Sequence, residues 1–230
     1  MTSPLALSPN AALSVTRFGR EEQPLVTVTD ALADPAQVVE IAARHSYKPI
    51  GAFYPGLRAA VSERIAMPLV DPLLEHFVSA FGLARTPRFR ECFLSVVTAS
   101  PSDLAPIQRL PHFDGTEPER LAVLLYLDAQ ETGGTGFYRQ RATGFESVDE
   151  SRFETYRETL ESEIARHGLP DSRYIDGDTE IFEQTHRIEG AFNSLVIYRG
   201  NTLHCAALPG DFAPETDPRK GRLTLNLFLD

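Results

Sequence analysis

Residues 222–229 read Arg-Leu-Thr-Leu-Asn-Leu-Phe-Leu, and this stretch carries the most information about the fold. Its four leucines alternate with Arg222, Thr224, Asn226 and Phe228, which is the period-2 pattern of a β-strand. The leucines therefore share one face, and the more polar set shares the other. In a sandwich the polar face meets solvent, whereas in a barrel that holds a ligand Arg222 and Thr224 point into the cavity. The stretch alone is compatible with both arrangements.

Other segments with the composition of strands begin at about residue 89. They are rich in β-branched, aromatic and leucine residues and lie at 92–98, 121–127, 136–140 and 194–198. One helix interrupts them, because Ser147 and Glu150 form a capping-box pattern and Gly168 follows the last apolar turn. Residues 89–230 are thus expected to form an antiparallel β core with a helical insertion at 147–168.

The first part of the chain, residues 1–88, has the pattern of a mixed α/β layer. Residues 25–28 alternate like a strand, and the dipeptides Asp34-Pro35 and Asp71-Pro72 each predict the start of a helix. Apolar residues follow the second dipeptide at helical spacing up to Gly82. We expect one domain, residues 1–230, mainly β with flanking helices that cover one face of the core.

Composition excludes several classes of partner. Lys and Arg number 22 against 32 Asp and Glu, a formal net charge of −10 that repels nucleic acid and anionic membranes. The sequence has no apolar stretch near the roughly 20 residues that span a bilayer, and it does not begin like a signal peptide. Cys92 and Cys205 are too few for a disulfide framework. We expect a cytoplasmic protein that binds neither nucleic acid nor membranes, and a homodimer is compatible with the sequence.

Three residues have the types and spacing of a metal site. His112-Phe113-Asp114 places an imidazole and a carboxylate on the same side of an extended segment, and His204 follows a strand-like segment and a turn at Gly200. Two histidines and one carboxylate form the facial triad of non-haem iron(II) sites, which leaves positions open for oxygen and a co-substrate. The alternative is that Asp114 caps a turn and that His112 lies on the surface.

The order of these motifs resembles that of the 2-oxoglutarate- and iron(II)-dependent oxygenases, specifically the prolyl-hydroxylase-like branch of the double-stranded β-helix fold, a jelly-roll or cupin-like architecture. Its members show His-x-Asp, an apolar strand that ends in Tyr-Leu-Asn, a Gly-Gly turn into a strand, a distal His and a basic residue on the last core strand. Here these positions are His112-Phe113-Asp114, 124–128, 133–137, His204 and Gly221-Arg222. Asp128 replaces the usual Asn, and Thr98 stands where a Tyr is frequent.

The sequence is also similar to a smaller bacterial family of uncharacterised function that shares the same triad. Residues 111–115 and 137–146 carry that likeness. It adds no information on a substrate.

The resemblance implies an enzyme in which His112, Asp114 and His204 are catalytic and hold iron(II), with 2-oxoglutarate as co-substrate. The implied reaction is hydroxylation, or a related oxidation, at an unactivated C–H bond. The implied partner is a small molecule or a peptide, and the prolyl-hydroxylase likeness favours an amino acid, a peptide or a protein side chain.

The resemblance also implies three co-substrate residues. Arg222 is suited to grip the far carboxylate of 2-oxoglutarate through a two-pronged charged hydrogen bond. Thr224 adds a hydroxyl on the same strand face, and Tyr126 supplies a further donor. The alternative for Arg222 is a solvated arginine on an edge strand.

Two other functions fit the same residues. A zinc hydrolase can use the same three ligands, and it would not need Arg222. A non-catalytic jelly-roll module can bind a metal, a ligand or a peptide through the same barrel. Both alternatives predict that 2-oxoglutarate is not consumed.

Overall fold

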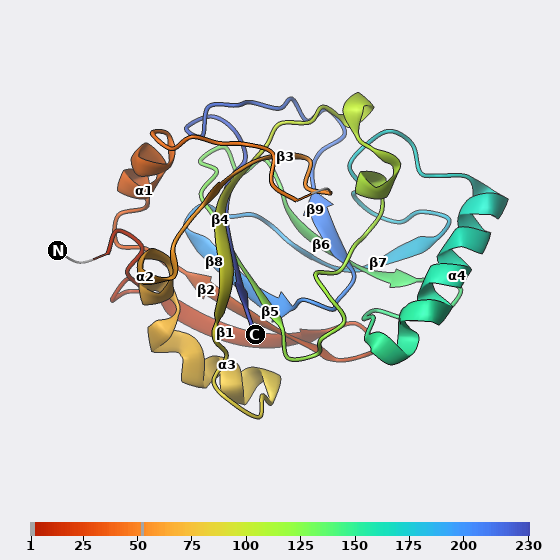
Figure 1. The fold of residues 1–230 in the computed structure, drawn as a ribbon, viewed down its shortest axis with the longest axis horizontal. Coiled ribbons are helices and arrows are strands. Elements are labelled where there is room, and N and C mark those ends of the chain that lie inside the picture. Colours follow the sequence, from red (N-terminus) through yellow and green to blue (C-terminus); the bar gives the residue numbers. More distant parts are fainter. Residues whose placement is uncertain (1–2, 52) are drawn as a thin grey trace.

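The computed structural model describes residues 3–51 and 53–230. It contains two antiparallel sheets, with α1, α2 and α3 on one side of the molecule and α4 on the opposite side (Figure 1). In the described part of the chain the larger sheet has, in spatial order, β1 (Ala12–Phe18), β2 (Gln23–Thr29), β8 (Ser194–Arg199), β5 (Leu121–Tyr126), β10 (Leu223–Leu229), β4 (Phe89–Val97) and β3 (Gly56–Ala60). The smaller sheet has the order β7 (Phe182–Ile188), β6 (Gly134–Gln140) and β9 (His204–Ala207).

The helices begin close to the predicted positions. They are α1 (Pro35–Ala42), α2 (Glu63–Ala66), α3 (Leu74–Phe81) and α4 (Glu150–His167), with 3₁₀ turns η1 (Met67–Leu69), η2 (Asp71–Leu73), η3 (Pro101–Asp103) and η4 (Pro106–Arg109). Asp34 caps α1 as predicted, since its side chain accepts a hydrogen bond from the backbone of Gln37 at 2.9 Å. Asp71-Pro72 opens η2, one 3₁₀ turn before α3, and Gly82 ends α3 in the left-handed conformation.

The predicted capping box of the insertion helix is wrong at its first residue. The N-cap of α4 is Asp149, whose carboxylate accepts the backbone N–H of Arg152 at 3.0 Å. Ser147 lies before the helix, and its hydroxyl donates to Glu21 instead. The helix starts later than predicted because a carboxylate nearer to it takes the free N–H groups of the first turn.

Strand β10 resolves the choice that its sequence left open. Its four leucines are fully buried and belong to one apolar cluster with Phe77 and Phe81 of α3. The opposite face looks into the molecule, where Phe228 packs with Tyr126 and Phe137. The leucines therefore pack outward against the N-terminal layer, and the polar set lines the interior of a double-stranded β-helix, as predicted.

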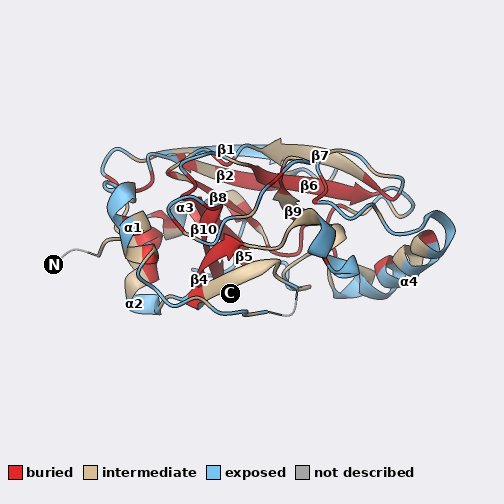
Figure 2. Ribbon diagram, turned by 90° about the horizontal axis from the view of Figure 1, so that it is seen from above, coloured by how far each residue is buried: buried red, intermediate tan, exposed pale blue. Residues whose placement is uncertain are grey.

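An aromatic core joins the two sheets. Phe137 of β6 lies with its ring centroid 4.6 Å from that of Phe18 on β1 and 5.0 Å from that of Tyr198 on β8. Seen from above, the buried strands fill the centre of the molecule and most exposed backbone belongs to helices and loops (Figure 2). The sheets are thus held face to face by side chains of the inner faces.

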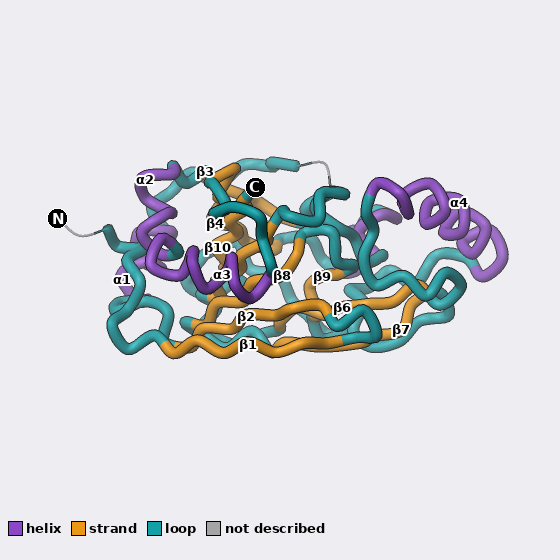
Figure 3. Tube along the Cα trace, turned by 90° about the horizontal axis from the view of Figure 1, so that it is seen from below, coloured by secondary structure: helices purple, strands orange, loops and turns teal. Residues whose placement is uncertain are grey.

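Loops run between the two groups of helices (Figure 3). The hydroxyl of Tyr174 donates to the carbonyl of Ala99 at 2.9 Å, and the Tyr174 ring meets Phe212 edge-on with centroids 5.5 Å apart. Three loops that are distant in sequence are therefore tied together near the start of β10. None of the helices in the described residues is long and apolar enough to cross a membrane.

The outward packing of β10 generates a stability prediction. Leu225→Ala removes a fully buried side chain between the sheet and the helices, and it is expected to lower the free energy of unfolding by about 2–5 kcal/mol. The matched control is Leu169→Ala, because Leu169 is 39% exposed, and its effect is expected to stay within about 0.5 kcal/mol. Urea titration followed by circular dichroism measures both. Equal losses in the two variants would contradict this packing.

Candidate metal centre

A β-bridge brings the two predicted histidines together. The backbone N–H of His112 donates to the carbonyl of His204, and the N–H of His204 donates back, each at 2.8 Å. Two residues later the N–H of Asp114 donates to the carbonyl of Gly200 at 2.7 Å. The segment around His112 is therefore held beside the turn that precedes β9, and Asp114 lies on the same side as His112.

The three side chains converge on one point. One potential ligand atom from each of His112, Asp114 and His204 lies within 4.8 Å of the other two. An oxygen of Asp114 is 3.4 Å from Nε2 of His204, and the other is 3.8 Å from Nε2 of His112. Among the described residues this is the single His, Cys, Asp and Glu group with such spacing. The position of Asp114 is therefore explained by its convergence with the two histidines, and the alternative role as a turn cap is not needed.

His204 is oriented by a backbone carbonyl two residues before it. Its Nδ1 lies 2.8 Å from the carbonyl of Thr202, and only a protonated Nδ1 can donate to that oxygen. In a neutral His204 the Nε2 lone pair is then left free, and Nε2 lies 3.4 Å from a carboxylate oxygen of Asp114. The Thr202 carbonyl thus orients a side chain that is buried. A carbonyl that holds the distal N–H of an imidazole is the usual support of a metal-binding histidine.

The electrostatics favour the protonation states that bind metal. Desolvation raises the pKa of Asp114, but the neighbouring His204, with His112 and Arg58, outweighs it and lowers that pKa below its usual value. The His112 side chain is 53% exposed, so water reaches part of the ring. Desolvation by the surrounding protein, followed by the charge of His204, lowers the pKa of His112 to about 4. An ionised carboxylate and a neutral imidazole are the forms that ligate divalent metals.

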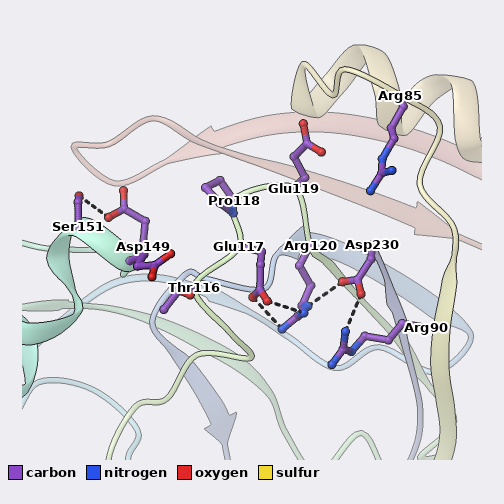
Figure 4. A pocket seen from close by; sticks show the side chains of 11 residues that line it. Arg85, Arg90, Thr116, Glu117, Pro118, Glu119, Arg120, Asp149, Ser151 and Asp230 are labelled. Carbon is purple, nitrogen blue, oxygen red and sulfur yellow. Dashed lines mark hydrogen bonds and ion pairs between the residues drawn. The ribbon is translucent and has the colours of Figure 1, made fainter.

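A buried arginine supports Asp114 from outside the barrel. Arg120 donates through Nη1 to the backbone carbonyl of Asp114 at 2.7 Å, through Nε to Asp230 at 2.8 Å and through Nη2 to Glu117 at 3.0 Å. Figure 4 shows Arg120 between these two carboxylates, at the edge of a charged surface pocket of about 690 Å³. The pocket does not contain the triad, but its wall fixes the segment that carries Asp114.

Arg222 lies inside the barrel and is almost fully buried. Its Nη2 donates to the carbonyl of Gly134 at 2.9 Å, and its Nε has no hydrogen-bond partner among the described residues. The following strand, β10, runs between β5 and β4. The alternative of a solvated edge-strand arginine is therefore wrong.

The two other predicted co-substrate residues also lie on the inner face. Thr224 pairs with Tyr126 across β5 and β10, and both are buried. The hydroxyl of Tyr126 is 2.6 Å from that of Thr135, and Thr224 donates to the side chain of Asn226 at 2.7 Å. Their hydroxyls thus already have partners, whereas Arg222 retains an unused donor.

Arg222 and the triad are separated by about three residues of β6. Gly134, which accepts the hydrogen bond of Arg222, pairs with Ala207, whereas Phe137 pairs with His204. Three residues of extended strand span roughly 10 Å. A buried cation therefore lies about the length of one small ligand away from His112, Asp114 and His204.

Sequence analysis did not identify three further polar groups of this interior. The Tyr54 hydroxyl, the Arg58 Nε and the Ser95 hydroxyl are buried without a hydrogen-bond partner among the described residues. Burial raises the pKa of Tyr54, against the charges of Arg222 and Arg58, so its phenol stays protonated. Ser95 had a signal in the sequence, as the one hydroxyl within the otherwise apolar run 92–97 of β4. Tyr54 and Arg58 lie between the two predicted helix starts, in a segment for which the sequence analysis predicted no strand.

Comparisons with known proteins agree with this fold. The family of unknown function DUF6445 matches residues 9–229. No curated protein gives a significant match.

Solved structures give more distant likenesses. The α-ketoglutarate-dependent carbocyclase SnoK from nogalamycin biosynthesis is 14% identical, with 91% of this chain and 81% of that chain covered and a TM-score of 0.50. HygX from Streptomyces hygroscopicus, solved with nickel and 2-oxoglutarate bound, is 9% identical to this chain. The match covers 91% of this chain and 83% of HygX, and its TM-score is also 0.50. A prolyl-4-hydroxylase from Pseudomonas putida is 14% identical. That match covers 91% of this chain and 93% of the hydroxylase chain, with a TM-score of 0.45. The first two confirm the predicted oxygenase-type fold, and at these identities they show the fold alone.

The support of Asp114 by Arg120 generates a binding prediction. Arg120→Met keeps the length of the side chain and removes its donors, and it is expected to weaken divalent metal binding about 10- to 100-fold. The matched control is Arg141→Met, since Arg141 is exposed and pairs with Asp178 away from the triad. Calorimetric titration of cobalt(II) into the folded variants measures the affinities. An unchanged affinity in Arg120→Met would show that the arginine does not position the ligand.

Proposed function

We propose that this chain, which belongs to the family of unknown function DUF6445, is a non-haem iron(II) oxygenase that uses 2-oxoglutarate. The proposal assigns iron(II) to His112, Asp114 and His204, and the far carboxylate of 2-oxoglutarate to Arg222. The observation that carries it is the combination of a converging His-Asp-His group with a buried, incompletely bonded arginine in the same barrel.

The donor set fits iron(II). Two neutral imidazoles and one carboxylate match a borderline divalent transition metal, and they are a poor match for magnesium or calcium, which prefer oxygen ligands. Three protein ligands on one side leave other coordination positions for a chelating co-substrate and oxygen. Bound at this site, iron(II) supplies the activation of oxygen, with 2-oxoglutarate as the source of electrons, for the oxidation of a C–H bond.

The arginine fits a dicarboxylate. A buried guanidinium with a free N–H is poorly satisfied by one carbonyl, because burial of an unpaired charge is strongly unfavourable. A carboxylate can accept two parallel hydrogen bonds from it. Tyr126 lies beside Arg222, with its ring centroid 6.0 Å from the guanidinium carbon, and its hydroxyl can turn from Thr135 toward the same carboxylate.

The protein's other contribution is an aromatic wall beside the triad. The inner face beyond the triad is aromatic, with Tyr198 packed edge-on against the His204 ring at a centroid distance of 4.8 Å. Burial raises the pKa of Tyr198 well above its usual value, so it stays neutral beside Asp114. Such walls hold the substrate against the metal and limit access of water.

The substrate class follows from the proposal less directly. We expect an amino acid, a peptide or a protein side chain that is hydroxylated. The solved structures of similar fold include enzymes described as a carbocyclase and a prolyl-4-hydroxylase, so the fold accommodates more than one oxidative outcome.

The proposal predicts an optical signature. Anaerobic titration of 2-oxoglutarate into the iron(II)-loaded protein is expected to produce a weak visible metal-to-ligand charge-transfer band. His112→Ala is expected to lose the band because a metal ligand is missing. Arg222→Ala is expected to need at least about 100-fold more 2-oxoglutarate, because a buried ionic hydrogen bond of about 3 kcal/mol is lost.

The controls separate this proposal from its rivals. His45→Ala changes an exposed histidine far from the triad in sequence and is expected to leave the band unchanged. A wild-type protein that binds zinc tightly and gives no band with iron(II) and 2-oxoglutarate would contradict the oxygenase and favour a zinc hydrolase. A protein that binds neither would favour a binding module.

A further inference from the structure

Arg58 is a second interior arginine, and its backbone is fixed on both sides. It lies on β3, exchanges backbone hydrogen bonds of 2.9 and 3.0 Å with Lys48, and pairs with Ser95 of β4. Ser95 pairs in turn with Thr224 of β10. Directly paired residues share a sheet face, so Arg58 points into the barrel together with these two residues.

The guanidinium of Arg58 is held by aromatic rings. Its central carbon lies 4.0 Å from the ring centroid of Tyr54 and 5.2 Å from that of Phe93. These contacts hold the plane of the cation without using its N–H donors. Its Nε is buried and has no hydrogen-bond partner among the described residues.

A comparison with Arg139 shows what is missing around Arg58. Arg139 is buried, whereas Arg58 is half-buried, and Arg139 donates through Nε to Glu146 and through Nη1 to Glu183, each at 2.8 Å. Arg58 has no carboxylate within ion-pair distance in the described part of the chain. Burial lowers the pKa of Arg58, against the attraction of Tyr54 and Asp114, and an arginine remains charged under all ordinary conditions.

Arg58 lies next to a segment that contacts the loop before His112. Arg58 packs on Tyr54, and the segment of Tyr54 meets the loop that leads to His112 where Gln108 donates to the carbonyl of Phe53. Arg222 donates to the carbonyl of Gly134 on β6, whereas Arg58 is held on β3 against the rings of Tyr54 and Phe93. The two arginines are therefore anchored to different strands of the interior.

Two loops next to Arg58 carry exposed apolar side chains. Phe53 is 67% exposed and Ile107 is 43% exposed, and the loops that carry them meet where Gln108 donates to the carbonyl of Phe53 at 3.2 Å. Exposed large apolar side chains at a rim are common features of ligand contacts. A ligand of Arg58 therefore has an apolar surface available next to its charge.

We propose that Arg58 binds an anionic group, most simply a carboxylate, of the primary substrate, and that the substrate carries an apolar group next to it. This inference rests on the proposed function, because it assigns the triad and Arg222 to iron(II) and 2-oxoglutarate. An anion at Arg58 would take up the unused donors of a preorganised cation. Arg58 would then determine which substrates are accepted, since a neutral analogue leaves that cation unpaired.

The test compares two probes that differ by one charge. The apolar carboxylate 4-fluorophenylacetate and its uncharged analogue 4-fluorophenylacetamide are titrated, with fluorine NMR, into protein loaded with zinc and 2-oxoglutarate, in which no turnover occurs. Wild type is expected to bind the carboxylate at least about tenfold more tightly, a difference of about 1.4 kcal/mol. In Arg58→Gln the ratio of the affinities for the carboxylate and the amide is expected to fall to about 1. Arg58→Lys is expected to retain part of the preference for the carboxylate.

Controls locate the effect. Arg44→Gln removes an exposed positive charge elsewhere and is expected to leave the ratio unchanged. With manganese(II) in place of zinc, the fluorine signal of the carboxylate is expected to broaden selectively, because the probe binds beside the metal. The affinity for 2-oxoglutarate is expected to change less than twofold in Arg58→Gln.

Several results would overturn the proposal. They are equal binding of the two probes by wild type, binding of neither probe, an unchanged ratio in Arg58→Gln, and a loss of 2-oxoglutarate affinity in Arg58→Gln of tenfold or more. The last result would assign Arg58 to the co-substrate. A wild-type protein that does not bind 2-oxoglutarate would count against the proposed function instead, and the probe ratio measured with zinc alone would still decide the role of Arg58.

Discussion

The backbone bridge between His112 and His204 is the interaction on which the rest of the site depends. Two hydrogen bonds of 2.8 Å join segments that are far apart in the chain, and they set the two imidazoles side by side with ring centroids 4.4 Å apart. The alternation of an extended segment then places Asp114 on the same side. The convergence of the candidate metal ligands is thus a consequence of strand pairing, and the side chains need no long-range adjustment to meet.

The interior of the barrel has a second constraint, which is the burial of positive charge. Arg139 is balanced by a buried carboxylate of the chain itself, whereas Arg222 and Arg58 keep unpartnered Nε donors within the described residues. In a medium of low dielectric constant such groups destabilise the folded protein unless a ligand satisfies them. The arrangement is therefore explained more simply by anionic ligands than by packing. A protein with a net charge of −10 can still bind anions when its few free cations are concentrated inside one cavity.

Much of the fold could be predicted from the sequence, because strong patterns agree with the tertiary structure. The period-2 leucines of β10, the Asp34-Pro35 helix start and the His-x-Asp pair all occupy the predicted settings. Less could be predicted where local pattern is weak. The edge strands β1 and β3 are short or largely exposed and depend on their neighbours for pairing, and β7 is polar along most of its length. Arg58 was missed for the same reason, since its role depends on its partners Ser95 and Tyr54 and not on a motif.

The central claim is that one iron(II) ion binds at the point where His112, Asp114 and His204 converge. The most direct test is anomalous X-ray diffraction at the iron edge, from crystals grown without oxygen in the presence of iron(II) and 2-oxoglutarate. The account predicts one strong anomalous peak, about 2 Å from an imidazole nitrogen of each histidine and from a carboxylate oxygen of Asp114, by analogy with other imidazole–metal bonds. The absence of a peak at this point, or a peak bound by other residues, would contradict it.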